Sequence, residues 1–311
     1  MRALTTKYSA SRISPSNEMR LKKWNISEVY THMFLNDFCG YYSIYLSSNK
    51  YVSASSDFYN IESENELLKK ILTFNAPREL DYMLNESFSC ITRTLVEHGK
   101  AFVEIVIWKD KDGNIAGITF EVLKPMLSFP GIKRRHFISI LNNKKLRLYS
   151  IEKKKIIVFD LHELGYSRHY FRRMLKKINR LNFSKVPNLL VERDSGFDFK
   201  KYNENAEYKL LKNTKKIYWY GRDRSNQYMN DFYLIWRESH LLKLRERFLN
   251  YILSKVNGSL KSLGECYEFA GIITANCRNV DFSHDFSKLQ SGEINLSQFG
   301  DILYEVPKRD E

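Results

Sequence analysis

The chain has 311 residues, 50 Lys and Arg against 36 Asp and Glu, and a formal net charge of +14. With 43% hydrophobic residues it is too apolar for a wholly disordered protein, and its four scattered cysteines form neither a disulfide scaffold nor a zinc motif. The excess positive charge favours a polyanionic partner. No run of about 18 apolar residues is present, so we expect no membrane span and a cytoplasmic protein.

The N-terminal segment, residues 1–23, is polar, basic and rich in Ser and Thr. It lacks the apolar region of a secretory signal, and we expect a frayed end, although its composition also suits a transit peptide. The remainder is predicted to form an α+β domain over 24–190, with a central hairpin and a basic meander and helix. A loop-rich link, a long helix and a helical tail follow over 191–311.

The first elements combine helices with one aromatic segment. A helix is predicted soon after Trp24, and the β-prone residues 41–46 are expected to start a hairpin. Leu and Ile recur at helical spacing over 62–74 and 78–98, which predicts two helices. Gly99 follows the second of them, at the position where a C-cap glycine belongs.

The clearest strand pair comes next, over 101–108 and 115–123, with Gly113 in its turn. Three short strands at 137–141, 146–151 and 156–159 are then expected to form a small antiparallel meander.

The rest of the chain is predicted to be mostly helical. A basic amphipathic helix is expected over 168–183, and a polar, loop-rich link over 192–213. The longest helix is predicted over 230–256, where Asn257 and Gly258 would end it, and a short helix over 296–304. The fold class is therefore α+β, with helices packed around antiparallel strands.

Basic residues gather in the middle of the chain and predict a surface that contacts nucleic-acid phosphates. This predicted surface comprises Lys133, Arg134, Arg135, Lys144, Lys145, Lys153, Lys154, Lys155, Arg172, Arg173, Lys176, Lys177 and Arg180. Further along, cations alternate with aromatic residues, a mixture that can neutralise phosphate and stack on bases. The residues there are Lys215, Lys216, Trp219, Arg222 and Arg224. A buried aromatic segment with solvated flanks is the alternative for 217–220.

Three groups of acidic residues are candidates for catalytic or metal sites. Glu192, Asp194 and Asp198 could hold Mg²⁺ in a nuclease, but a solvated loop is the favoured interpretation. Asp160 with His162 and Glu163 is better explained as a polar turn at a strand end. Glu104 and Glu121 are expected to face each other across the hairpin as exposed charges. The sequence predicts no metal and no cofactor outside the nuclease hypothesis.

The middle of the chain resembles tailed-phage portal proteins. The similarity rests on the leucine-rich segment and Asn-Ala-Pro break at 67–77, the helix after it, and the sequence VEHGKAFVEI at 96–105. It continues through the turn at 110–113, Leu123-Lys124-Pro125 and a strand at 155–160, with Lys100 where the family usually has Asn. The resemblance implies self-assembly, sequence-independent DNA contact and no catalysis, in a virion if the protein is structural.

The leading hypothesis is therefore a non-enzymatic, phage-related protein that self-assembles and contacts nucleic-acid backbone, DNA more than RNA. One alternative is an effector that acts on nucleic acid, such as a metal-dependent nuclease or an anti-phage defence protein. Another is a protein-interaction module that uses the long helix. In that case Arg237, Lys243, Arg245 and Arg247 would present a basic face to an acidic protein partner.

Overall fold

The computed structural model contains two compact units that interleave along the chain. The sheet unit comprises Met1–Lys22, Val52–Arg168 and Phe248–Asn276, and the helical unit comprises Lys23–Tyr51, His169–Arg247 and Cys277–Glu311. The structure describes residues 2–3, 29–46, 58–63, 67–73, 80–123, 127–130, 135–142, 145–185, 199–221, 230–277 and 282–304. The α+β class is confirmed, and every strand of these described residues belongs to the sheet unit.

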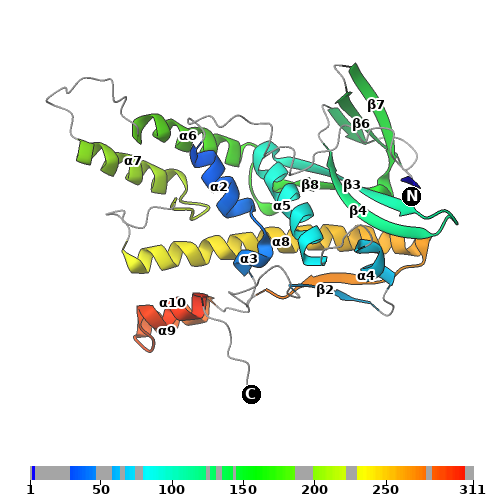
Figure 1. The fold of residues 1–311 in the computed structure, drawn as a ribbon. Coiled ribbons are helices and arrows are strands. Elements are labelled where there is room, and N and C mark those ends of the chain that lie inside the picture. Colours follow the sequence, from blue (N-terminus) through cyan, green and yellow to red (C-terminus); the bar gives the residue numbers. More distant parts are fainter. Residues whose placement is uncertain are drawn as a thin grey trace. The chain divides into compact units, whose positions relative to one another are not determined.

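The predicted hairpin is confirmed and forms the centre of the sheet unit (Figure 1). Strand β3 (Lys100–Lys109) pairs antiparallel with β4 (Ile115–Leu123), and Gly113 in the turn has a φ of +90°. On its other side β3 pairs with β8 (Ile156–Asp160), and its far end pairs with β1 (Arg2–Ala3). The central strand is buried because it has sheet neighbours on both sides and helix α5 against it.

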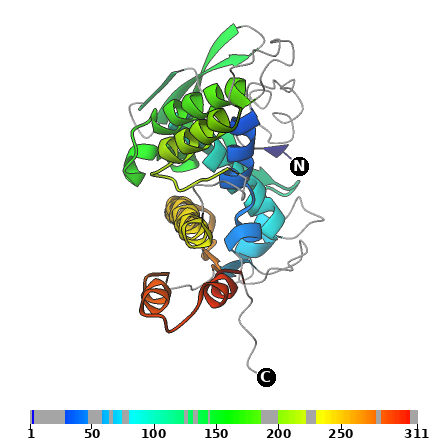
Figure 2. The ribbon, with the colours of Figure 1, turned by 90° about the vertical axis from the view of Figure 1, so that its left-hand side faces the viewer.

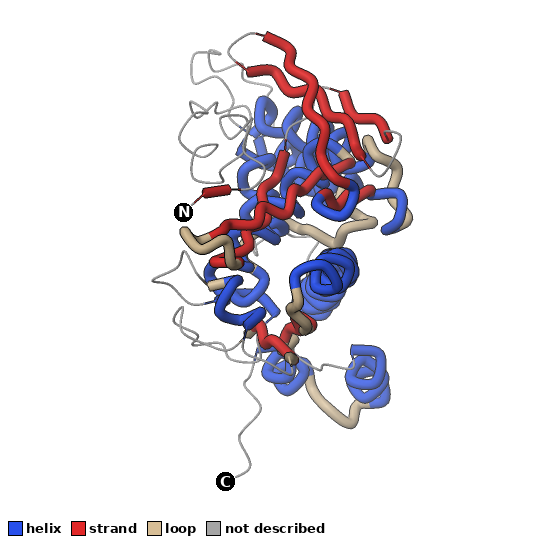
Figure 3. Tube along the Cα trace, turned by 90° about the vertical axis from the view of Figure 1, so that its right-hand side faces the viewer, coloured by secondary structure: helices blue, strands red, loops and turns tan. Residues whose placement is uncertain are grey.

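The predicted meander is wrong at its third strand. A separate antiparallel sheet contains β5 (Leu127–Pro130), β6 (Arg135–Asn142) and β7 (Lys145–Glu152), drawn in red in Figure 3. The single turn η3 (Lys153–Lys155) then separates β7 from β8. Strand β8 joins β3 instead because its apolar side chains are buried in the central sheet.

Helices and a second strand pair complete the sheet unit. Helix α5 (Leu80–His98) packs on β3, and Gly99 follows it with a φ of +79°, as the C-cap prediction required. The helix predicted over 62–74 begins only at α4 (Leu67–Leu72) among the described residues. Its expected first residue belongs instead to β2 (Tyr59–Glu62), which pairs with β9 (Ile272–Ala275). Asp81 accepts the amides of residues 58 and 59 at 2.8 and 2.7 Å and holds β2 on the first turn of α5.

The helical unit contains α2 (Val29–Cys39), α3 (Tyr42–Leu46), α6 (Tyr170–Lys185), α7 (Phe199–Asn213), α9 (Phe282–Ser291) and α10 (Leu296–Tyr304). Helix α6 lies between α2 and α7 and packs on both (Figure 2). The short helix expected over 296–304 is confirmed as α10.

Two segments of this unit correct the sequence predictions. The aromatic residues 41–46 form helix α3 and not a strand, because Tyr42 and Leu46, one turn apart, both enter the core. The polar stretch expected to be a loop contains α7, since Ala206 and Leu210 share a buried face. The remaining residues of that stretch that precede α7 lie outside the described part.

The long helix α8 (Asp231–Tyr267) continues about three turns past its predicted end. Its residues 231–247 belong to the helical unit and the rest to the sheet unit. Asn257 and Gly258 do not end it, because the Asn257 amide is used elsewhere: it donates to the Ile273 carbonyl at 2.8 Å and accepts from the Ile273 amide at 2.9 Å. None of the described helices combines the length and the apolar character needed to cross a membrane.

Candidate nucleic-acid interface

Helix α6 carries a regular basic surface. Its cations recur at intervals of one, three, one and three residues, at Arg172, Arg173, Lys176, Lys177 and Arg180. With 3.6 residues per turn, they cover about 140° of the helix circumference. All five side chains are exposed, so the prediction of a basic amphipathic helix is confirmed and its charges form one stripe.

The opposite face of α6 fixes this stripe outward. Phe171, Met174 and Ile178 are buried, and Phe171 stacks on Phe34 of α2 with ring centroids 6.1 Å apart. The helix cannot rotate its cations inward without exposing these apolar side chains to water. Within the described part of the chain, no ion pair is formed by Arg172, Arg173, Lys176 or Lys177.

The segment after α7 is only partly available. Lys215 and Lys216 are exposed, but Trp219 is 1% exposed and its indole donates to the Asp37 carboxylate at 2.9 Å. Its ring also meets Phe34 edge-on at 5.4 Å. Base stacking on Trp219 is therefore a wrong prediction for this structure, because the ring belongs to the core. The alternative prediction of a buried aromatic segment is correct for Ile217 and Trp219, which are both buried. The segment forms a turn and not a strand.

The three consecutive lysines of the sheet unit, Lys153 to Lys155, are also only partly exposed. Lys153 and Lys154 are exposed on η3, and the Lys154 ammonium lies 3.2 Å from the Cys266 sulfur. Lys155 is 5% exposed and pairs with Glu152 at 3.4 Å. The prediction that Lys155 contacts nucleic acid is therefore wrong, because its ammonium is buried and pairs with Glu152 within the fold.

Several predicted residues lie outside the described part of the chain. These are the cations Lys133, Arg134, Lys144, Arg222 and Arg224, and the acidic residues Glu192, Asp194 and Asp198. For Arg135 and Lys145 the structure describes the backbone, in β6 and β7, and not the side chains. The nuclease hypothesis therefore stays a prediction. Among the described residues, no three His, Cys, Asp or Glu side chains gather as metal ligands would.

Asp160 is the centre of a polar cluster that serves the fold. Its carboxylate accepts from Arg168 at 2.8 Å, from Lys100 at 3.1 Å and from the backbone amide of His162 at 3.1 Å. Partial burial raises the pKa of Asp160, but these three donors outweigh it and hold the pKa at about 2. A carboxylate held so firmly in its ionised form is a poor general acid or base near neutral pH.

The two carboxylates of the hairpin are directly opposite each other in the β3–β4 register, as expected. Their environment differs from the expectation, because Glu104 is completely buried rather than solvated. The strand positions that pair with Glu104 are Glu121 on one side and Ile156 on the other.

Two arginines of α8 overturn the expectation of a basic face on that helix. Arg237 and Arg245 are 0% and 1% exposed, and both donate to backbone carbonyls within the helical unit. Arg247 is exposed and Lys243 half-buried. The sequence did not predict these roles, because the acceptors are backbone carbonyls. Every residue has such a carbonyl, so no sequence motif distinguishes a buried arginine of this kind from an exposed one.

Comparison with the models of known protein families and with curated proteins finds no match to this chain.

Proposed function

We propose that this protein binds nucleic-acid backbones through the exposed face of α6 without reading base sequence. It is a non-enzymatic, basic protein that self-assembles, and DNA is the favoured partner. The observation that carries the proposal is the stripe of five exposed cations on α6, held outward by the buried face of the helix. Flexible cationic side chains attract phosphates and displace their counterions, but they do not distinguish one base pair from another.

Self-assembly and a portal-like character rest on the sequence resemblance. The order of helix, glycine, strand, Asp-Gly turn and strand in α5, Gly99, β3 and β4 is compatible with it. Mass photometry and sedimentation across a range of protein concentrations test this part separately. A strict monomer at micromolar concentration would remove the assembly proposal and leave the binding proposal intact.

The binding experiment measures the affinity for two fluorescent duplexes of unrelated sequence over a series of salt concentrations. We expect similar affinities for the two duplexes and a steep fall between about 50 and 200 mM salt. If all five cations of α6 meet phosphates, they account for a log–log slope of about −4.5. A single-stranded RNA probe in the same series compares the two classes of nucleic acid.

A double variant assigns the interface to α6. Arg172→Gln with Arg173→Gln is expected to reduce the magnitude of the salt slope by about 2 and to weaken both duplexes equally. The matched control is Lys69→Gln with Lys70→Gln, which removes the same charge from exposed positions of α4. An equal loss in the control, or no loss in the α6 variant, would show that α6 is not the interface.

A further inference from the structure

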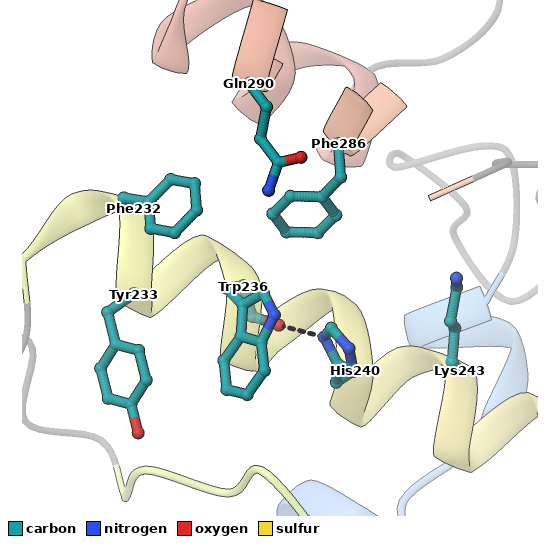
Figure 4. A pocket seen from close by; sticks show the side chains of 7 residues that line it. All are labelled: Phe232, Tyr233, Trp236, His240, Lys243, Phe286 and Gln290. Carbon is teal, nitrogen blue, oxygen red and sulfur yellow. Dashed lines mark hydrogen bonds between the residues drawn. The ribbon is translucent and has the colours of Figure 1, made fainter. Parts of the chain in front are cut away.

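A second candidate site lies in the helical unit, between the first turns of α8 and helix α9. It is a pocket of about 460 Å³, a size within the usual range for small-molecule sites. Figure 4 shows Phe232, Trp236, His240 and Lys243 in a row along α8, with Phe286 and Gln290 of α9 on the other side of the pocket. The row follows helical spacing of four, four and three residues, which places its members on one face.

The pocket is walled by aromatic rings that hold one another in place. Trp236 lies 4.5 Å from the His240 ring, and Phe232 meets Phe286 of α9 edge-on at 6.0 Å. Phe286 packs in turn against the buried ring of Phe299, with centroids 4.6 Å apart. Trp236 also stacks on Tyr233, with ring centroids 5.6 Å apart. The walls are therefore held in place before a ligand arrives, and the rings of Phe232 and Phe286 offer aromatic surface to a flat ligand.

The polar groups of the pocket restrict the chemistry of that ring. The Nδ1 of His240 lies 2.7 Å from the Trp236 carbonyl, which can only accept, so Nδ1 carries a hydrogen. Burial lowers the pKa of His240, although this hydrogen bond opposes the shift, and in the neutral ring Nε2 is an acceptor. The Gln290 side chain points toward α8 in Figure 4 and adds an amide that both donates and accepts.

The charge of the residues that line the pocket distinguishes a cationic ligand from an anionic one. Lys243, at the end of the aromatic row, is its one permanently charged residue, and no carboxylate lines the described pocket. Although Lys243 also interacts electrostatically with Glu246 on α8, its ammonium disfavours a quaternary ammonium ligand of the kind that aromatic cages bind. A ligand with an aromatic heterocycle and an anionic group at one end matches both the rings and the ammonium.

We propose that this pocket binds a nucleoside monophosphate, with its base against the rings of Trp236 and Phe286 that line the pocket and its phosphate at Lys243. The same chemistry is presented by a free nucleotide and by the 5′-phosphorylated end of a single strand. The inference does not depend on the α6 interface, because the pocket residues and the cations of α6 are separate.

Isothermal titration with adenosine 5′-monophosphate tests the pocket, with adenosine and inorganic phosphate as partial ligands. We expect saturable binding of the monophosphate at one site, and weaker binding of either part alone. Trp236→Ala should weaken the monophosphate about tenfold or more, the scale of stacking on a single base. Lys243→Gln should weaken the monophosphate while leaving adenosine unchanged, which a merely unfolded variant would not do.

The matched control is Tyr208→Ala, which removes an exposed aromatic ring from α7 and should bind like the parent protein. Trp236→Phe keeps a ring, so it should retain binding but lose the ligand-dependent quenching of tryptophan fluorescence. A 5′-phosphorylated oligonucleotide that binds more tightly than the monophosphate, and competes with it, identifies a strand end as the natural ligand. The reverse order identifies a free nucleotide.

Two results would overturn the proposal. One is the absence of monophosphate binding at millimolar concentration by the folded parent protein. The other is tighter binding of tetramethylammonium than of the monophosphate, which would assign the pocket to cations. The Arg172→Gln and Arg173→Gln variant should bind the monophosphate normally, so failure here and failure of the α6 interface are distinguishable.

Discussion

The guanidinium of Arg237 donates to the carbonyl oxygen of Trp219 at 2.9 Å, and both side chains are buried. The same guanidinium donates to the Tyr218 carbonyl at 3.0 Å and to the Thr214 hydroxyl at 2.9 Å. Tyr218 has a φ of +60°, an unfavourable conformation for a residue with a side chain. Arg237 therefore adds hydrogen bonds to the Tyr218 and Trp219 carbonyls of this turn and stabilises its left-handed conformation.

Replacing Arg237 with Met is expected to destabilise the protein by about 2–4 kcal/mol, because several buried acceptors lose their donor at once. Urea denaturation followed by circular dichroism measures the change. The control is Arg247→Met on the same helix, where the side chain is exposed and a change within about 0.5 kcal/mol is expected. Similar losses in both variants would mean that burial of Arg237 contributes nothing specific.

Arg245 performs a related role at the end of α2. It donates to the carbonyls of Asp37 and Gly40, and its guanidinium lies 3.8 Å from the centre of the Tyr45 ring. Complete burial lowers its pKa, which the neighbouring tyrosines oppose. The positive charge at the C-terminal carbonyls of a helix also complements the helix dipole.

Lysine cannot reproduce this arrangement, because an ammonium lacks the planar fork and does not stack on a ring in the same way. Arg245→Lys should therefore lower the free energy of unfolding by about 1–3 kcal/mol although the charge is kept. In a double-mutant cycle, Tyr45→Leu should cost less in the Arg245→Lys background by the cation–π energy, about 0.5–2 kcal/mol. Strict additivity of the two substitutions would exclude the stacking interaction.

These arginines also show why part of the structure could not be predicted from the sequence. The acceptors of Arg237 in the turn at residues 214–219 lie 18 to 23 positions away, and the Gly40 carbonyl is 205 positions from Arg245. On a helix, such arginines look like any solvated cation until the partners are known. The stripe on α6 was predictable because both its cations and its buried residues follow the helical period.

The same distinction separates the correct strands from the wrong ones. The β3–β4 hairpin is a local structure whose turn and alternation are adjacent in sequence, whereas β8 finds its partner about 55 residues upstream. Residues 41–46 have strand-like composition, but burial of Tyr42 and Leu46 on one helical face decides their conformation. The aromatic residues of the pocket on α8 recur at the helical spacing that is typical of buried core residues. The sequence alone therefore could not predict that they line a pocket.

Gly99 is a position where both backbone conformation and space exclude a side chain. Its φ is +79°, and a Cβ atom there would lie 2.3 Å from the carbonyl oxygen of Arg168. We expect Gly99→Ala to destabilise the protein by about 2–4 kcal/mol, the sum of conformational strain and a steric clash. Gly113→Ala is the control: its φ is +90° but no atom lies within 4 Å, so only about 1 kcal/mol is expected. Thermal unfolding of the two variants should therefore give clearly different midpoints.

Asp160 predicts a component of acid sensitivity. Its pKa in the folded protein is about 2, below the ordinary value of 3.8, so its ionised form stabilises the fold. That stabilisation is fully present above about pH 4 and is lost as the pH falls toward 2. Because the carboxylate is 14% exposed, we expect it to contribute about 1–2 kcal/mol.

The measurement is the free energy of unfolding of the parent protein and of Asp160→Asn between about pH 2 and pH 6. Asp160→Asn should be less stable at pH 6, and the gap should narrow as the pH falls, because protonation removes the same charge from the parent protein. Asp112→Asn provides the comparison, since Asp112 is exposed in the β3–β4 turn and should leave the acid profile as it is in the parent protein. A gap that stays constant with pH would mean that Asp160 contributes through its shape and hydrogen bonds alone, and not through its charge toward Lys100 and Arg168.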